Sequence, residues 1–506
     1  MELLSVTCCS ASILLDPDGD YYAREAADLF LNGEKLRREE RAVFDLTGLM
    51  PDTEYLLTAV YPDREDRFAF RTDRETCKLD VRRFGAIGDG AHDDTAALQA
   101  AIACCPDFGR VCVPPGVYLT GPLFLKSRIT LEIRQGAVLS LITDRERFPV
   151  LPGVTFTGDG EYLLGSFEGN PLDSYASALT GIGLEQVRVV GGGTVDGRAN
   201  EGDWWVEPKK RRGAWRGHLL YLKDCSDVLV EGITFRNSPC WNLHPAFSED
   251  LRFLCVRVQA PANSPNTDGF DPQSCRKVCL LGTLFTVGDD CIAIKSGKIY
   301  MGRTYHTPCE DVEIAHCAML DGHGGVTVGS EMAGGVRHVR VHHCYMRGSD
   351  RGLRIKTRRG RGKDGVIDDI RFEDVRMEGV KVPLAVNSLY FCDPDGHAPW
   401  VQSREPVPVD DSTPAVGTIV FERVTARDCE GCAAYILGLP EKPVEKVLLR
   451  DCRFTFKQDA KPVQAVMADG AGPVCRQGVI NGFVRELVLE DVVMEGITGD
   501  KVTGVQ

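Results

Sequence analysis

The stretch Ser226-Asp227-Val228-Leu229-Val230 contains a motif that recurs along most of the chain: a polar pair, alternating apolar residues and then a turn. The first apolar residue of each repeat lies at position 228, 251, 278, 312, 339, 370, 419, 447 or 487, so successive repeats are 23, 27, 34, 27, 31, 49, 28 and 40 residues apart. Minimum steps in the twenties with irregular insertions are typical of a solenoid whose coils each hold two or three short strands. The pattern predicts a parallel β-helix.

Two other repeat folds fit the spacing less well. A leucine-rich repeat would show a fixed pattern of leucine and asparagine, and a propeller would show even spacing near about 40 residues. Insertions in a solenoid emerge as loops, so the long ones at 142–180, 296–308 and 384–415 are predicted to wall a groove. A helix is predicted at 94–105, with Asp93 or Asp94 as its N-cap, and it would cover the open end of the solenoid. No other helix is expected.

Residues 1–76 are predicted to form a separate small all-β domain. Residues 54–61 and 67–70 alternate in polarity, as half-buried strands do. Residues 49–55, Leu-Met-Pro-Asp-Thr-Glu-Tyr, resemble the tyrosine corner of fibronectin type III domains. We therefore expect a fibronectin type III-like β-sandwich at 1–76 and the β-helix at 77–506. The alternative is that the first segment extends the sheet of the second.

Composition narrows the class of protein. The chain has 506 residues, 43% of them hydrophobic, and a formal net charge of -14. A large core is therefore expected, and the acidic balance argues against a nucleic-acid or anionic-membrane partner. The N-terminus lacks a basic region, and no apolar run approaches the length of a membrane span, so a cytoplasmic protein with its 20 cysteines mostly reduced and buried is expected. A single CxxC pair (Cys429 and Cys432) gives little support for a metal site, and neither a metal nor a cofactor is predicted.

Acidic residues gather at one place in the repeats. The segment 266–269 (Asn-Thr-Asp-Gly) lies about one coil before the segment 288–290 (Gly-Asp-Asp), and neighbouring strands of a β-helix are about 4.8 Å apart. Farther along come 322–324 (Gly-His-Gly) and 354–356 (Arg-Ile-Lys). Each motif alone is consistent with a turn between strands. Three carboxylates in register repel one another, which favours a functional role.

The chemistry that uses such a cluster is glycoside hydrolysis. One carboxylic acid protonates the leaving oxygen and a carboxylate activates water. Crowded like charges raise the pKa of one group, so that it stays protonated near neutral pH. Arg354 and Lys356 alternate along a strand and point to the same face, where they would suit a substrate that carries its own carboxylate.

The motifs NTD, GDD, GHG and RIK, in this order and spacing, resemble those of glycoside hydrolase family 28, the polygalacturonases, over residues 80–500. The resemblance implies a right-handed parallel β-helix that hydrolyses α-1,4-linked galacturonic acid with inversion. It implies these roles: Asp289 as general acid, Asp268 and Asp290 as the pair that holds water, His323 as support for the acid, Arg354 and Lys356 as contacts to the galacturonate carboxylate, and Asn266 as a polar neighbour. The one-coil spacing predicts closer carboxyls than the roughly 6.5–9.5 Å usual for inverting enzymes.

Two further segments resemble the bacterial exo-polygalacturonase branch, in which a fibronectin-like N-terminal domain also occurs. They are residues 329–335 and 238–245. The resemblance implies attack from the non-reducing end of galacturonate-containing oligosaccharides. Trp241 and His244 are predicted to line the site, with core packing as the alternative for Trp241, and Tyr390 is predicted to contact the substrate.

A basic run and two competing functions remain open. Residues 354–363 include six basic side chains, which form either a solvated loop or a field that steers an anionic sugar. One alternative function is a pectate lyase with calcium bound by the three aspartates. The other is a non-catalytic pectin-binding solenoid. The exact galacturonan, the oligomeric state and the role of the N-terminal domain are not determined by the sequence.

Overall fold

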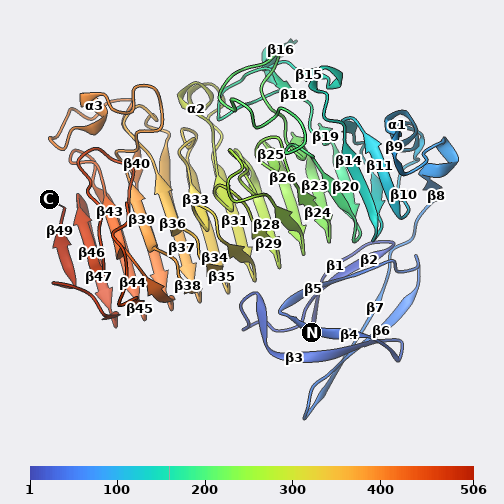
Figure 1. The fold of residues 1–506 in the computed structure, drawn as a ribbon, viewed down its shortest axis with the longest axis horizontal. Coiled ribbons are helices and arrows are strands. Elements are labelled where there is room, and N and C mark those ends of the chain that lie inside the picture. Colours follow the sequence, from blue (N-terminus) through green and yellow to red (C-terminus); the bar gives the residue numbers. More distant parts are fainter. Residues whose placement is uncertain (159, 506) are drawn as a thin grey trace.

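The computed structural model describes residues 1–158 and 160–505, mostly as β-strands (Figure 1). It confirms the predicted right-handed parallel β-helix. Two long parallel sheets run along the solenoid, and a third side, called the groove sheet here, is divided into a four-stranded and a seven-stranded part. The first long sheet follows this strand sequence: β8 (Lys78–Asp80), β10 (Gly109–Val113), β13 (Ile129–Ile133), β20 (Glu185–Val190), β23 (Ser226–Glu231), β26 (Glu249–Leu254), β28 (Arg276–Leu281), β31 (Cys309–Ala315), β34 (Val336–His342), β37 (Val366–Glu373), β41 (Thr418–Glu422), β44 (Val444–Arg450) and β47 (Val484–Glu490), with β40 (Ala415–Val416) beside β37.

The second long sheet and the groove sheet complete each coil. The second long sheet contains β9 (Asp89–Asp93), β11 (Gly116–Thr120), β14 (Ala137–Leu141), β21 (Thr194–Asp196), β24 (Thr234–Arg236), β27 (Arg257–Gln259), β29 (Leu284–Thr286), β32 (Ala318–Leu320), β35 (Tyr345–Arg347), β38 (Arg376–Glu378), β42 (Thr425–Cys429), β45 (Arg453–Phe456) and β48 (Val493–Glu495). The groove sheet contains β12 (Leu123–Phe124), β19 (Leu179–Ile182), β22 (Leu220–Lys223), β25 (Leu243–Ala246), β30 (Ile292–Ile294), β33 (Val326–Val328), β36 (Arg351–Lys356), β39 (Val382–Asn387), β43 (Cys432–Leu437), β46 (Gln477–Gly482) and β49 (Val502–Gly504).

The sequence repeat is the register of the first long sheet. Each of the nine apolar residues that mark the repeats pairs directly with the next, from Val228 with Leu251 to Val447 with Leu487. These side chains are buried, or partly buried at Leu487, and form one wall of the core. The second residue of the polar pair has a positive φ in six successive repeats, beginning with Asp227 (51°) and Asp250 (52°). Polar, unbranched residues tolerate this backbone best, so the pair marks the kink that begins each strand.

Helices are short and lie at the ends of coils or in loops. The predicted helix is α1 (Thr95–Cys104), and its buried residues Leu98, Ala101 and Ile102 join the core at the first coil. Asp94 occupies the N-cap position without a capping side-chain bond, because its carboxylate accepts hydrogen bonds from the backbone of Ile87 and Gly88. The expectation of a single helix was wrong. The other elements outside the long sheets are α2 (Ile299–Tyr305), α3 (Pro399–Gln402), the short 3-10 helices η1 (Val81–Phe84) and η2 (Arg145–Arg147), and the loop strands β15 (Val150–Leu151), β16 (Val154–Thr157), β17 (Gly160–Leu163) and β18 (Ser174–Tyr175).

The first 71 residues form an antiparallel two-sheet sandwich, which lies along the solenoid on the side opposite the long loops (Figure 1). One sheet has the order β1-β2-β5 and the other the order β4-β3-β6-β7. The antiparallel pairing of the sandwich ends with β7, and the parallel pairing of the solenoid begins with β8. The predicted boundary near residue 76 lies between them. The strands are β1 (Glu2–Val6), β2 (Ser10–Leu14), β3 (Tyr22–Leu31), β4 (Glu34–Arg41), β5 (Val43–Thr47), β6 (Glu54–Val60) and β7 (Glu65–Arg71).

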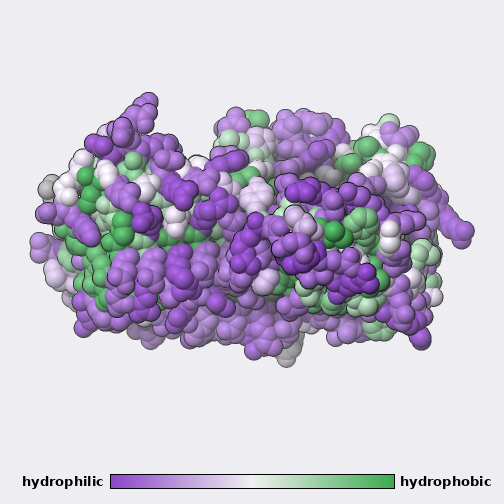
Figure 2. All heavy atoms as spheres, turned by 90° about the horizontal axis from the view of Figure 1, so that it is seen from below, coloured by the Kyte–Doolittle hydropathy of each residue, from purple (hydrophilic) through white to green (hydrophobic). Residues whose placement is uncertain are grey.

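The sandwich is packed against the solenoid. Cys8 and Cys9 form an apolar cluster with Leu229 and Leu254 of the first long sheet, and Tyr21 packs against Tyr345 of the second. Seen from below, the molecule is predominantly hydrophilic with scattered hydrophobic residues (Figure 2). None of the helices in the described residues is long and apolar enough to cross a membrane. All 20 cysteines are free thiols and 15 of them are buried, as predicted.

A buried carboxylate lies in this interface and gives a test of how the two parts depend on each other. The side chain of Glu231 is fully buried and accepts hydrogen bonds from the hydroxyls of Ser5 and Ser12 in the sandwich. Burial raises the pKa of Glu231, so its charged form opposes folding increasingly as the pH rises above the ordinary glutamate range.

We therefore expect Glu231→Gln to raise the thermal unfolding midpoint by a few degrees at pH 8. The gain should shrink toward pH 4, where Glu231 is protonated in the folded and unfolded states. Differential scanning calorimetry across this pH range measures it. A loss of stability that is equal at pH 8 and pH 4 would contradict the prediction.

Candidate active site

The three predicted aspartates lie where the groove sheet is interrupted. Between β25 and β30 one coil pairs only through isolated bridges, such as Phe270 with Ile292 and Gln273 with Lys295. Asp268 lies just before the bridged segment of this coil, and Asp290 lies just before β30 in the following coil. The register of the flanking strands therefore brings the two segments side by side, as the one-coil spacing predicted.

The carboxyls form a compact cluster. One carboxylate oxygen from each of Asp268, Asp289 and Asp290 lies within 4.8 Å of the other two. Asp268 and Asp290 are buried, whereas the side chain of Asp289 is 24% exposed. The cluster thus has one accessible carboxyl, that of Asp289, beside two buried ones.

The environments of the buried carboxyls differ. Burial and the charge of Asp289 raise the pKa of Asp268 to about 8. Burial alone would raise the pKa of Asp290 too, but Lys356 and Arg354 outweigh it and lower that pKa well below the ordinary range. Because the carboxyls interact, they titrate as a group. The cluster therefore combines a retained proton with a carboxylate near neutral pH, which acid–base chemistry requires.

The histidine and the two cations converge on this cluster. His323 Nδ1 lies 3.3 Å from Asp289 Oδ1, and this contact raises the pKa of His323. Lys356 Nζ donates to Asp290 Oδ2 at 2.7 Å, and Arg354 donates to Asp290 Oδ1 at 3.2 Å. Without substrate, both predicted carboxylate-binding cations are thus paired with a protein carboxylate.

The structure brings together most of the remaining predicted residues. Asn266 lines the pocket and accepts a hydrogen bond from Arg216. Tyr390 also lines it, with its ring centroid 5.6 Å from Lys356 Nζ. Trp241 is both buried and pocket-lining, so the two readings of this residue are compatible. His244 differs: it is fully buried beneath the pocket, and its Nδ1 contacts the backbone oxygen of Asp271 at 2.8 Å.

The pocket has a volume of about 410 Å³ and is lined by residues from all three predicted loops. Four lysines and six acidic residues line it, so the expected local excess of positive charge is absent from its wall. The lining residues are Glu168, Lys209, Trp241, Asn266, Asp268, Asp289, Asp290, Lys295, Lys298, Ser330, Glu331, Lys356, Tyr390, Cys392, Asp393 and Pro394.

The basic run at 354–363 is mostly buried and paired inside the protein, so of the two alternatives left open by the sequence, the solvated loop was wrong. Five of its six basic side chains are buried, and Lys363 is exposed. Arg358 and Arg361 both bind Asp393 in the loop after β39, which Lys298 also contacts at 3.0 Å. These pairs connect the walls of the pocket to the coil that carries Arg354 and Lys356.

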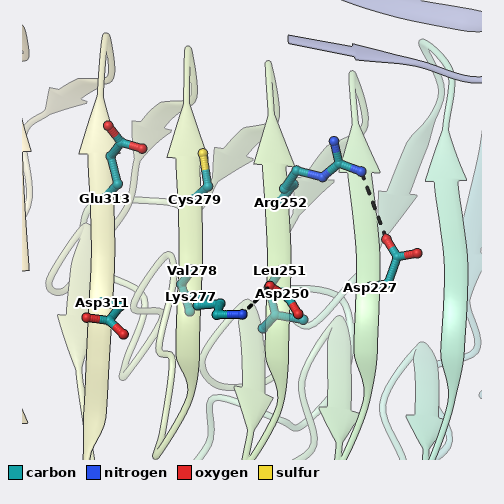
Figure 3. A pocket seen from close by; sticks show the side chains of 9 residues that line it. All are labelled: Asp227, Asp250, Leu251, Arg252, Lys277, Val278, Cys279, Asp311 and Glu313. Carbon is teal, nitrogen blue, oxygen red and sulfur yellow. Dashed lines mark ion pairs between the residues drawn. The ribbon is translucent and has the colours of Figure 1, made fainter.

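A second hollow, of about 540 Å³, lies on the outer face of the first long sheet (Figure 3). Its charged side chains come from successive strands and pair along the sheet, as Lys277 does with Asp250 at 3.5 Å. It is open, and its lining contains none of the cluster residues. We therefore assign the chemistry to the smaller pocket.

Sequence reasoning missed the buried charges beside the acids, above all Lys295 and Glu331. Lys295 follows a short apolar strand just as Lys356 follows Ile355, and both point out of the groove sheet. A lysine at the end of an otherwise apolar strand was therefore the available signal. Nothing in the sequence indicated that Glu331 would reach it.

Known proteins resemble this chain in sequence and fold. Residues 139–467 match the model of the glycosyl hydrolases family 28, and residues 79–132 match the model described as rhamnogalacturonase A/epimerase, pectate lyase-like. A probable polygalacturonase from Vitis vinifera is 30% identical over 397 residues, covering 77% of this chain and 76% of the relative.

Two solved structures also match. The exopolygalacturonase of Thermotoga maritima has 28% sequence identity and a TM-score of 0.68, covering 84% of this chain and 93% of that one. The family 28 exopolygalacturonase of Yersinia enterocolitica has a TM-score of 0.73 and covers 100% of this chain and 98% of that one, but at 18% identity it supports the fold alone. Other relatives include both endo- and exo-acting enzymes.

Proposed function

The chain belongs to the glycosyl hydrolases family 28, and from this premise we propose that it is an exo-acting polygalacturonase that removes galacturonate from the non-reducing end of oligogalacturonides. The observation that carries the proposal is the cluster of three carboxyls beside two buried cations, in a pocket walled by loops on several sides. Such walls favour a chain end over the middle of a polymer, because an open groove would accept either.

The residues have the following proposed roles. Asp289 is the accessible carboxyl and protonates the leaving oxygen, and His323, whose raised pKa keeps it a proton donor, returns a proton to Asp289. Asp268 and Asp290 hold the attacking water, and Lys356 and Arg354 keep Asp290 ionised. When galacturonate enters, its carboxylate shares these two cations with Asp290.

We infer inversion at the anomeric carbon, although the cluster is more compact than the separation usual for inverting enzymes. The 4.8 Å limit applies to one oxygen of each carboxyl, and in this assignment Asp268 and Asp290 hold the water while Asp289 acts from the opposite side of the sugar. Proton NMR of the first product released from a defined oligogalacturonide tests this assignment. We expect the β-anomer from the α-linkage and monomeric galacturonate as the early product. A retained anomer would remove the mechanism, and a rapid fall in polymer viscosity with mid-chain products would remove exo action.

The lyase alternative makes a different prediction. A calcium ion bound by the three aspartates would compete with Lys356 and Arg354 for the oxygens of Asp290, so the pairing in the structure favours the hydrolase. Elimination creates a double bond that absorbs near 235 nm, whereas hydrolysis does not. Absorbance at this wavelength and loss of turnover with a chelator would support the lyase.

We also infer that residues 1–76 are a fibronectin type III-like module. The sheet orders β1-β2-β5 and β4-β3-β6-β7 and the hydrogen bond from the Met50 backbone to the Tyr55 hydroxyl, at 2.8 Å, support this inference. A cytoplasmic location remains our proposal, supported by the free, buried thiols. Fractionation of the source cells tests it.

A further inference from the structure

Lys295 lies in the wall of the pocket and has no part in the roles proposed above. It directly follows β30, pairs with Gln273 of the preceding coil and faces the groove. Its side chain is only 4% exposed, and its ammonium lies 4.6 Å from the ring centroid of Trp241. A buried lysine is rare unless its charge is paired, so its partners define its role.

Three carboxyls surround this one ammonium. Nζ lies 3.1 Å from Glu331 Oε2, 3.6 Å from Asp271 Oδ1 and 3.8 Å from Asp268 Oδ2. Asp271 is fully buried, and burial raises its pKa well above the ordinary range, which favours its neutral form and weakens its hold on the ammonium. The ammonium is therefore divided between Glu331, which it binds directly, and Asp268.

The two competing carboxyls are held differently. Glu331 follows β33 and is also faced by Lys298, Arg361 and Lys356; these cations with Lys295 outweigh its burial and lower its pKa. Asp268 is faced by the charges of Asp289 and Asp290, against which Lys295 acts most strongly and Lys356 next. Lys356 is already bound to Asp290. Lys295 is thus the cation on which the charged form of Asp268 most depends.

We propose that Lys295 is a positioning residue that holds the Asp268 carboxylate toward the water site. Glu331 fixes Lys295 in place and, by pairing with it, weakens the stabilisation that Lys295 gives to charged Asp268. This inference rests on the proposed function, in which Asp268 holds the attacking water with Asp290; because the pKa of Asp268 is raised, it takes this role once it has lost its proton. It predicts that the two members of the Lys295–Glu331 pair change the ionisation of Asp268 in opposite directions: Lys295 favours its charged form and Glu331 opposes it. A pair that only supports the fold would not do so.

The test is the pH dependence of kcat/KM for hydrolysis of a defined oligogalacturonide. In Lys295→Met the ionisation that limits activity on the acidic side should move upward by about one pH unit or more, because an opposite charge at this distance is lost. In Glu331→Gln it should move downward, since Lys295 is then free to serve Asp268. Lys295→Arg should restore most of the wild-type profile.

Lys209→Met is the matched control, because it removes a lysine that lines the same pocket but pairs with Glu168 rather than with Asp268 or Glu331. Its acidic limb should stay near that of the wild type. Circular dichroism and thermal unfolding identify variants that fail to fold, and Glu331→Gln keeps the test decisive if Lys295→Met is one of them. The inference is overturned if the acidic limb of the pH profile does not move in Lys295→Met and Glu331→Gln, or if it moves in the same direction in these two variants.

Asp268→Asn separates the two levels of the argument. If this variant is inactive while the limbs of the Lys295 and Glu331 variants do not move, the inference fails and the proposed function stands. If it retains wild-type turnover, the role of Asp268 in the proposed function fails as well.

Discussion

Replacing Asp289 by asparagine is expected to lower kcat by about 10²–10⁴-fold, with little change in the affinity for oligogalacturonides. Asparagine keeps the size of the side chain but has no proton to give to the leaving oxygen, and the cations of the site are untouched. Turnover is measured by release of reducing ends, and binding by isothermal titration calorimetry.

Asp250→Asn is the control for this experiment, since Asp250 is an exposed aspartate in the hollow of Figure 3 and should leave kcat unchanged. Full activity in Asp289→Asn would remove the proposed mechanism. A wild-type protein that binds oligogalacturonides but never cleaves them would instead support the non-catalytic solenoid.

Lys356→Met should have the second largest effect, on stability as well as activity. Taking one partner from a buried ion pair typically costs about 3–5 kcal/mol, and here Asp290 would keep its longer contact with Arg354, so we expect a cost toward the lower end. Asp290 has a depressed pKa, so the stability that it contributes is present above the ordinary aspartate pKa and is lost as the pH falls through its folded pKa. The stability difference from wild type should therefore begin to narrow as the pH falls from the ordinary aspartate range toward pH 3, where the unfolded state takes up a proton at Asp290.

Denaturant unfolding from pH 3 to pH 8 measures this difference, and kcat/KM should fall in parallel because a substrate carboxylate loses a contact. Lys363→Met is the control from the same basic run, since Lys363 is exposed and pairs only with exposed Asp411. Exposed pairs contribute about 0–1 kcal/mol. An equal effect in the two variants would show that the buried pair has no special importance.

The repeat and the acid cluster could be predicted because both depend on sequence separation. Residues one coil apart become neighbours in a parallel sheet, so the pairing of Val228 with Leu251 and the approach of Asp268 to Asp290 follow from counting. The kinks could be anticipated in the same way, since a polar residue recurs where the backbone has a positive φ.

The charged wall of the pocket could not be predicted, because its pairs join segments with no common period. Arg358 binds Asp393 and Asp395, and Arg359 binds Glu441, 82 residues away, through loops whose paths are set by tertiary packing. For this reason the sequence left the basic run open between a solvated loop and a steering field, whereas acidic loops bury it. The same reason explains why the contact of Glu331 with Lys295 was missed.

The reacting carboxyls lie directly beside backbone that is paired between coils, while the segments between the coils differ widely in length. A loop can therefore lengthen, shorten or be replaced without moving the carboxyls by a register step. In such an architecture, changes in the loops can alter the length of the product while the catalytic residues stay in place. Natural selection can vary one while the other is preserved, and a chimaera that exchanges only the segment 388–414 is the corresponding starting point for engineering.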